Sequence, residues 1–182
     1  MSNPVLRGRI ILIALVLMFA LPVVVAKTIL VNHWYHSGVT NKGVLIEPRT
    51  SFESLGLENP YQGAQWQLGY VVPSVCDEFC LEQLYLLGQS HIALGKYQTR
   101  VSPVLLITDS SDVGAIESEG FDTVHIDGEM NQVLSDFEYV IVDPLGQLVM
   151  RYPKAQAQDE LVSQSKNVLA DLRKLLKLSR VG

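Results

Sequence analysis

The chain contains two cysteines, Cys76 and Cys80, and they are the residues best suited to do chemistry. They close the segment PSVCDEFC, which covers residues 73–80. If Cys76 starts a helix, Cys80 follows about one turn later on nearly the same face, with the two Cα atoms ~6 Å apart. A disulfide can bridge that distance. The spacing therefore predicts a pair that can cycle between dithiol and disulfide.

A thiolate is both the nucleophile in disulfide exchange and a ligand for soft metals. At a helix N-terminus, Cys76 would have its thiolate stabilised by backbone N–H groups and the helix dipole. Asp77 and Glu78 add negative charge, so we expect only modest acidification of this thiol. We predict that Cys76 attacks as the more exposed thiol and that Cys80 resolves the mixed disulfide.

The competing interpretation is a structural bridge, or two buried thiols, in an exported protein. A bridge between Cys76 and Cys80 would close a short loop and constrain little of the unfolded chain. Its place between a predicted strand and a predicted helix also suits a reactive site. We therefore favour a functional pair.

An apolar segment, residues 10–26, contains seventeen residues without a charge and follows Arg7 and Arg9. It is either a cleaved signal peptide, with Val24 and Ala26 as the small-residue site, or a signal anchor that stays in the membrane. The anchor is favoured because the core of a signal peptide is usually about 7–15 residues long. The arginines should stay in the cytoplasm, which exports the C-terminal part to the periplasm of a bacterium.

The exported part shows a recognisable order of predicted elements. Residues 66–72 and 101–108 suggest buried strands, and residues 76–97 an amphipathic helix with an interruption near Gly88. The later elements are a short helix at 109–119, a strand at 123–126, a hairpin of 138–142 with 147–151, and a helix at 158–178.

This order predicts an α/β, thioredoxin-like domain, a central mixed sheet with helices on both faces. We assign residues 1–9 to the cytoplasm, 10–26 to a transmembrane helix, 27–60 to a juxtamembrane stalk with a first strand at 43–46, and 61–182 to this periplasmic domain.

Composition excludes several classes of protein. Of the 182 residues 48% are hydrophobic and 18% are charged, which excludes a disordered chain. The formal charge of -5 is unsuited to binding nucleic acid, which needs a basic face. The sequence has no Gly-rich phosphate loop, no HExxH and no Gly-x-Ser-x-Gly motif, so hydrolase and nucleotide-binding functions have no support.

Several motifs occur together in a specific order. They are TNKG at 40–43, Trp66-x-Leu, Cys76-Asp-x-x-Cys80, ALGK at 93–96, DPLG at 143–146 and MRYP at 150–153. This pattern resembles the Sco family of thioredoxin-like copper chaperones and thiol-disulfide reductases, and more closely the Sco-like, single-span proteins associated with cytochrome c oxidase in proteobacteria.

The resemblance implies a factor anchored in the bacterial inner membrane, whose Cys76 and Cys80 keep the copper-ligand cysteines of the oxidase reduced. The implied partners are oxidase subunits or other assembly factors. It also implies copper as a cofactor, bound by the two cysteines and a histidine about five residues before the hairpin tyrosine. Counting back from Tyr139 reaches Leu134, and residues 133–138 contain no histidine.

Two alternatives remain open for the cysteine pair. One is a Cu(I)-binding module, in which Cys76 and Cys80 are joined by a third ligand such as His125 or Met130. The other is a non-catalytic accessory subunit of the oxidase with a residual disulfide.

The other histidines are weaker candidates for a site. His33 and His36, with the aromatic residues between them, suit the membrane interface better than a metal site. His91 lies about three helical turns from Cys80, too far to share a metal with it.

Overall fold

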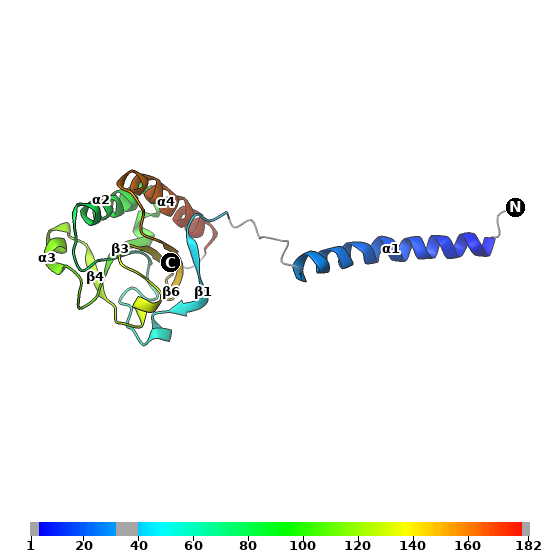
Figure 1. Cartoon of the computed structure of the whole chain (residues 1–182), viewed down its shortest axis with the longest axis horizontal. Coiled ribbons are helices and arrows are strands. Elements are labelled where there is room, and N and C mark those ends of the chain that lie inside the picture. The colour runs from blue at the N-terminus through cyan, green and yellow to red at the C-terminus, as the bar shows by residue number, and fades with distance from the viewer. Residues whose placement is uncertain (1–3, 32–39, 180–182) are drawn as a thin grey trace. The chain divides into compact units, whose positions relative to one another are not determined.

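The computed structural model describes residues 4–31 and 40–179 of the chain, which form two compact units, residues 1–40 and 41–182. The described residues of the first unit form the helix α1 (Pro4–Val31), drawn in blue in Figure 1. Its stretch Leu6–Ile29 has a mean hydropathy of 2.8, and none of that stretch is buried. At 1.5 Å per residue it exceeds the ~30 Å of a hydrocarbon core. A helix of this kind is consistent with a membrane anchor or a signal sequence.

The second unit is built on one six-stranded sheet (Figure 1). Its strands are β1 (Val44–Ser51), β2 (Trp66–Val71), β3 (Val101–Ile107), β4 (Asp122–His125), β5 (Tyr139–Val142) and β6 (Gln147–Tyr152). Their order across the sheet is β1-β6-β5-β2-β3-β4. Strands β2, β3 and β4 run parallel, whereas β5, β6 and β1 each pair antiparallel with their neighbours. The sheet is therefore mixed, with β2 at its centre.

One face of the sheet is covered by the two long helices, α2 (Glu78–Ala93) and α4 (Leu161–Leu178), which pack against each other. We call it the helix face. Its core contains residues of β2 such as Leu68 and Tyr70, with Leu84 of α2 and Leu172 of α4. The apolar residues of α2 and α4 recur at helical spacing, so each helix presents a buried stripe to the sheet.

The opposite face, which we call the loop face, is covered by irregular segments with two short 3-10 turns, η1 (Glu53–Leu55) and η4 (Met130–Gln132). Phe52, Met130 and Leu134 are among its largest contributions from outside the sheet, and each is at most 2% exposed. The helices expected on this face are therefore only single turns. η1 ends at Gly56, whose φ of 72° is left-handed and stops a helix at that point.

The thioredoxin-like α/β fold predicted from the order of elements is confirmed. Two details of the helix after β2 are different. It begins at Glu78 and ends at Ala93, where a 3-10 segment, η2 (Gly95–Arg100), follows, and it passes through Gly88 without interruption. A glycine inside a helix costs about 1 kcal/mol relative to alanine but does not break it, and here a Cβ would meet only Phe121 Cζ at an ordinary 3.5 Å.

The segment assigned to a stalk, residues 27–60, is divided in the structure. Residues 27–31 continue α1, and Val44–Ser51 form β1, which is longer than the expected strand at 43–46. The start of the second unit is fastened by Asp171 of α4, whose Oδ2 accepts hydrogen bonds from Lys42 N (2.6 Å) and Gly43 N (2.9 Å). His33 and His36 lie outside the described residues.

Candidate functional site at the cysteine pair

Cys76 and Cys80 form a disulfide, with their Cα atoms 5.1 Å apart. Cys76 lies between β2 and α2, just beyond the carboxyl end of the central strand, and Cys80 lies in the first turn of α2. Cys80 is fully buried, whereas Cys76 is half-buried and its neighbour Val75 is 68% exposed. The predicted pairing is confirmed, and the sulfur predicted to attack belongs to the more accessible cysteine.

Cys76 does not start the helix, contrary to the sequence prediction. Asp77 is the N-cap of α2, and its Oδ1 accepts a hydrogen bond from Cys80 N (3.1 Å). Asp is among the residues that cap helices best, because its side-chain oxygen satisfies an N–H that the first turn leaves free. Asp77 therefore takes the position at the helix start that was predicted for Cys76. Cys76 lies one residue before this cap.

A second loop holds the segment that carries Cys76. Residues 108–112, between β3 and α3 (Val113–Ile116), bond to it at three points. Ser111 Oγ donates to Val72 O (2.8 Å), Asp112 N donates to Pro73 O (2.9 Å), and Cys76 N donates to Asp112 Oδ2 (3.1 Å). The backbone on the N-terminal side of the disulfide is thus positioned by residues more than thirty places later in the sequence.

Beneath the disulfide, Gln83 of α2 connects the helix to two tyrosines of the sheet. Tyr70 Oη donates to Gln83 Oε1 (2.8 Å), and Tyr139 Oη donates to the Gln83 carbonyl (2.6 Å). Burial raises the pKa of both tyrosines well above the usual value, so both phenols stay protonated and donate. These bonds hold the first turns of α2, and with them Cys80, against β2 and β5.

Next to the cysteines lies a small aromatic cluster. Phe79, between the two cysteines in sequence, meets Phe137 edge to face with ring centroids 6.0 Å apart. Lys154 Nζ lies 3.6 Å from the centroid of the Phe137 ring. Phe137 has a φ of 66°, which is unfavourable for a bulky residue, and it is held by bonds from its N to Val71 O and from Gln83 Nε2 to its carbonyl. The surroundings of the disulfide therefore include an aromatic and a cationic side chain that the sequence analysis missed.

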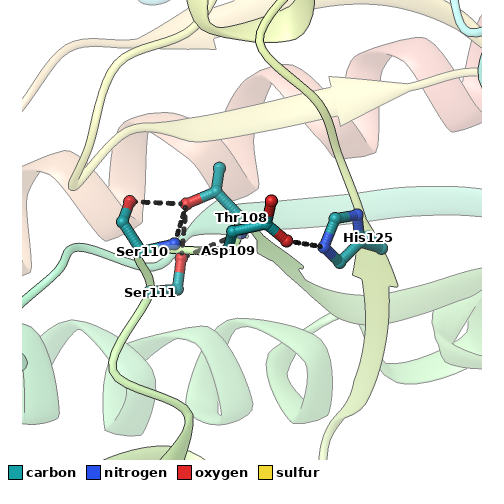
Figure 2. A network of polar contacts seen from close by, with 5 residues as sticks. All are labelled: Thr108, Asp109, Ser110, Ser111 and His125. Carbon is teal, nitrogen blue, oxygen red and sulfur yellow. Dashed lines mark hydrogen bonds and ion pairs between the residues drawn. The ribbon is translucent and has the colours of Figure 1, made fainter.

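The two side chains suggested as a third copper ligand lie in different places. His125, at the end of β4, is exposed, and its Nε2 lies 3.0 Å from Asp109 Oδ1. Figure 2 shows the two side chains facing each other. The same figure shows the Thr108 hydroxyl bonded to those of Ser110 and Ser111, within the loop that holds Cys76. Met130 is fully buried in the core of the loop face, whereas both cysteines belong to the helix face.

The residues that the structure describes do not assemble a copper site with three ligands. Among the described residues, no group of three or more His, Cys, Asp and Glu side chains is arranged to hold a metal. Met130 is separated from the cysteines by the sheet, and Leu134, at the position where the resemblance implies a histidine, is 2% exposed in the loop-face core. The donor set that the structure brings together is the cysteine pair.

Residues 66–179 match the model of a protein family described as transmembrane-like, thioredoxin-like, C-terminal domain. The match covers more than half of the chain.

The chain belongs to this family.

The matched residues contain the cysteine pair and every side chain that contacts it in the site described above. No curated protein sequence matches the chain.

Solved structures give distant similarities. Apo Sco1 from Thermus thermophilus has a TM-score of 0.48 at 17% identity, over 76% of this chain and 99% of that one. Yeast Sco1 with copper bound has 0.44 at 17% identity, over 78% and 96%. A secreted disulfide oxidoreductase of Mycobacterium tuberculosis has 0.39 at 24% identity, over 58% and 83%. These similarities concern the fold alone.

Proposed function

We propose that this protein is a membrane-anchored thiol-disulfide reductase that acts through Cys76 and Cys80. The observation that carries the proposal is the disulfide itself, formed next to the central strand with one half-buried and one fully buried cysteine. A sulfur that must meet another protein needs access, whereas a resolving sulfur only needs to reach its neighbour. The arrangement provides both, which a purely structural bridge does not require.

The exchange begins with the reduced chain. The Cys76 thiolate attacks one sulfur of a client disulfide, an intermolecular S–S bond forms, and the other client sulfur leaves as a thiolate. The Cys80 thiolate then attacks Cys76 Sγ and releases the second client sulfur. The client gains two electrons and becomes a dithiol, while this chain loses two and becomes the disulfide seen here. A dithiol reductant of the same compartment must restore the reduced chain.

The client we propose is the pair of copper-ligand cysteines of cytochrome c oxidase, which bind copper only as thiolates. The motifs shared with Sco-like proteins support this choice. We further propose that α1 stays uncleaved in a bacterial inner membrane, with the second unit in the periplasm. A shared membrane raises the effective concentration of factor and client.

A mixed-disulfide trap tests the exchange in cells that express the full chain. Cys80→Ser keeps the attacking thiol but removes the resolving one, so the intermolecular disulfide should accumulate on non-reducing gels. Cys76→Ser is the matched control, because it keeps only the buried cysteine and should capture less than about a tenth as much. Mass spectrometry of the trapped complex identifies the client. Equal capture by both variants, or by neither, would contradict exchange through Cys76.

The anchor is tested separately by the mass of the protein purified from whole cells. The full-length mass supports anchoring through α1. A mature form starting at Lys27 would show that the segment is a signal peptide, without affecting the exchange chemistry.

A further inference from the structure

Each cysteine of the pair has its backbone N–H held by a carboxylate, but the two carboxylates come from different places. Asp77, which bonds to Cys80 N, is three residues away and belongs to the same helix start. Asp112, which bonds to Cys76 N, is thirty-six residues away, on the loop after β3. Cys80 is also fixed by α2 and by complete burial. Cys76 has no helix of its own, so its position depends on the loop that holds it.

We propose that Asp112 is a positioning residue for disulfide exchange, which keeps Cys76 within reach of Cys80 after the disulfide opens. The proposal builds on the exchange function above. Asp112 makes contacts on both sides of the segment, because its N donates to Pro73 O and its Oδ2 accepts from Cys76 N. Residues 73–76 are thus held at both ends by Asp112, through its backbone N–H at Pro73 and through its side chain at Cys76.

The carboxylate is itself fixed by a third contact. Asp112 is the N-cap of α3, and its Oδ1 accepts from Ala115 N (3.3 Å). One oxygen therefore fastens the residue to α3 and the other fastens Cys76 to the residue. A side chain with a single acceptor cannot make both contacts at full strength. This requirement explains why an aspartate occupies the position.

Positioning of this kind determines the effective concentration of Cys76 Sγ at Cys80 Sγ. When the disulfide is reduced, Cys80 stays in α2. The disulfide can form again only when Cys76 returns to the position that it has in the oxidised chain. With the contact from Asp112, the open segment keeps few conformations and reclosure is favoured. Without it, the segment gains conformations, so the reduced chain becomes more stable relative to the disulfide.

The test measures the equilibrium between dithiol and disulfide in glutathione buffers, on the full chain in detergent micelles. Asp112→Ser is the main variant, because serine is a good N-cap and preserves α3 while its single short oxygen cannot also hold Cys76 N. We expect the equilibrium constant for disulfide formation to fall about tenfold, because the reduced segment then spends most of its time in conformations from which Cys76 cannot reach Cys80. That change equals a rise of about 30 mV in reduction potential.

Two further variants separate positioning from charge. Asp112→Asn removes the charge and leaves one acceptor oxygen, which reaches Cys76 N when the capping contact with Ala115 N is given up, so the constant should stay within about threefold of wild type. Asp109→Ala removes a carboxylate from the same loop that contacts His125 instead of the cysteine segment, and it should change nothing. Equal effects of the Ser and Asn variants would show that charge acts instead, and an unchanged constant in Asp112→Ser would also overturn the proposal. No client takes part in this measurement, so its outcome is independent of the trap experiment.

Discussion

The two faces of the sheet are built differently, and the difference is visible within the central strand. Toward the helix face, β2 and the residue after it present Trp66, Leu68, Tyr70 and Val72. Toward the loop face, the alternate positions are Gln67, Gly69 and Val71. The four side chains on the helix face are thus large and apolar. On the loop face the same strand presents a hydrogen-bonded glutamine, a glycine and only one apolar side chain, that of Val71.

The comparison shows that stability and chemistry are distributed differently over the fold. Both cysteines pack with the helix face, where α2 holds Cys80. The core of the loop face is equally well buried, with Met130 and Leu134 at most 2% exposed. Both cysteines, however, lie on the other side of the sheet. A cavity-forming substitution in the core of either face should destabilise the domain. Only one in the core of the helix face should also change the reactivity of the disulfide.

The largest effect is expected for Leu84→Ala on the helix face. Leu84 is fully buried and follows Cys80 by one turn of α2. The cavity should lower the free energy of unfolding by about 3–5 kcal/mol, measured by urea with Trp fluorescence. In the reduced chain, alkylation of Cys80 should become faster. Leu81→Ala, on the exposed side of the same helix, is the control and should change stability by about 0.5 kcal/mol or less.

Met130→Ala makes the matching change on the loop face. The side chain is fully buried, so we expect a loss of about 2–4 kcal/mol in the free energy of unfolding. The rate of reaction of the disulfide with glutathione should stay at the wild-type value, because the sheet separates this residue from the cysteines. Met130→Leu conserves the volume and should lose less than about 1.5 kcal/mol. A change in disulfide reactivity in the Ala variant would contradict the separation of the two faces.

The same contrast explains how much of the fold was predictable. The strands at 66–72 and 101–108 and the helix at 158–178 repeat apolar residues with a clear period, and each was found within a few residues of its place. The cover of the loop face has no period. Phe52, Met130 and Leu134 are each buried by tertiary contacts from segments that have no repeating pattern. The sequence analysis consequently offered Met130 as a thioether that could bind copper. In the structure it is a buried residue of the loop-face core.

The candidate site was predictable in the same uneven way. The CxxxC spacing predicted the Cys76–Cys80 pair because one turn of chain is a local distance. Asp77 was recognised only as a charge, although an Asp before a helix is a well-known N-cap signal. The contacts of Asp112 and Phe137 with the cysteine segment depend on how distant strands align. No local pattern contains that information.

A third prediction concerns Gly69, at the middle of the loop face. A Cβ at this position would lie 2.8 Å from Val140 Cγ1 and 3.2 Å from Leu106 Cδ1. Gly69→Ala should therefore force neighbouring strands to shift and lower the free energy of unfolding by about 1–3 kcal/mol. Combining it with Val140→Ala frees the space, so the double variant should be more stable than the sum of the two single losses predicts. Strict additivity would show that the steric contact is not the cause.

The smallest expected effect comes from Glu138, a carboxyl that is 4% exposed on the loop side of the sheet. Burial raises its pKa above the usual 4.5, and the bond from Ser135 N and the nearby Arg151 offset this only in part. The folded chain therefore binds a proton at Glu138 more tightly than the unfolded chain does. The stabilisation linked to that proton is complete below the usual pKa and is lost as the pH rises through the raised pKa.

Glu138→Gln removes this proton site and nearly preserves the shape of the side chain. We expect the free energy of unfolding of wild type, relative to the variant, to rise as the pH is lowered from 7 toward 4. Urea unfolding of both proteins at several pH values measures that difference. Glu129→Gln, which changes an exposed carboxyl in a neighbouring loop, serves as the control. A difference that stays flat, or falls with falling pH, would mean that Arg151 and Ser135 compensate the buried charge fully, and that this face tolerates a carboxylate without cost.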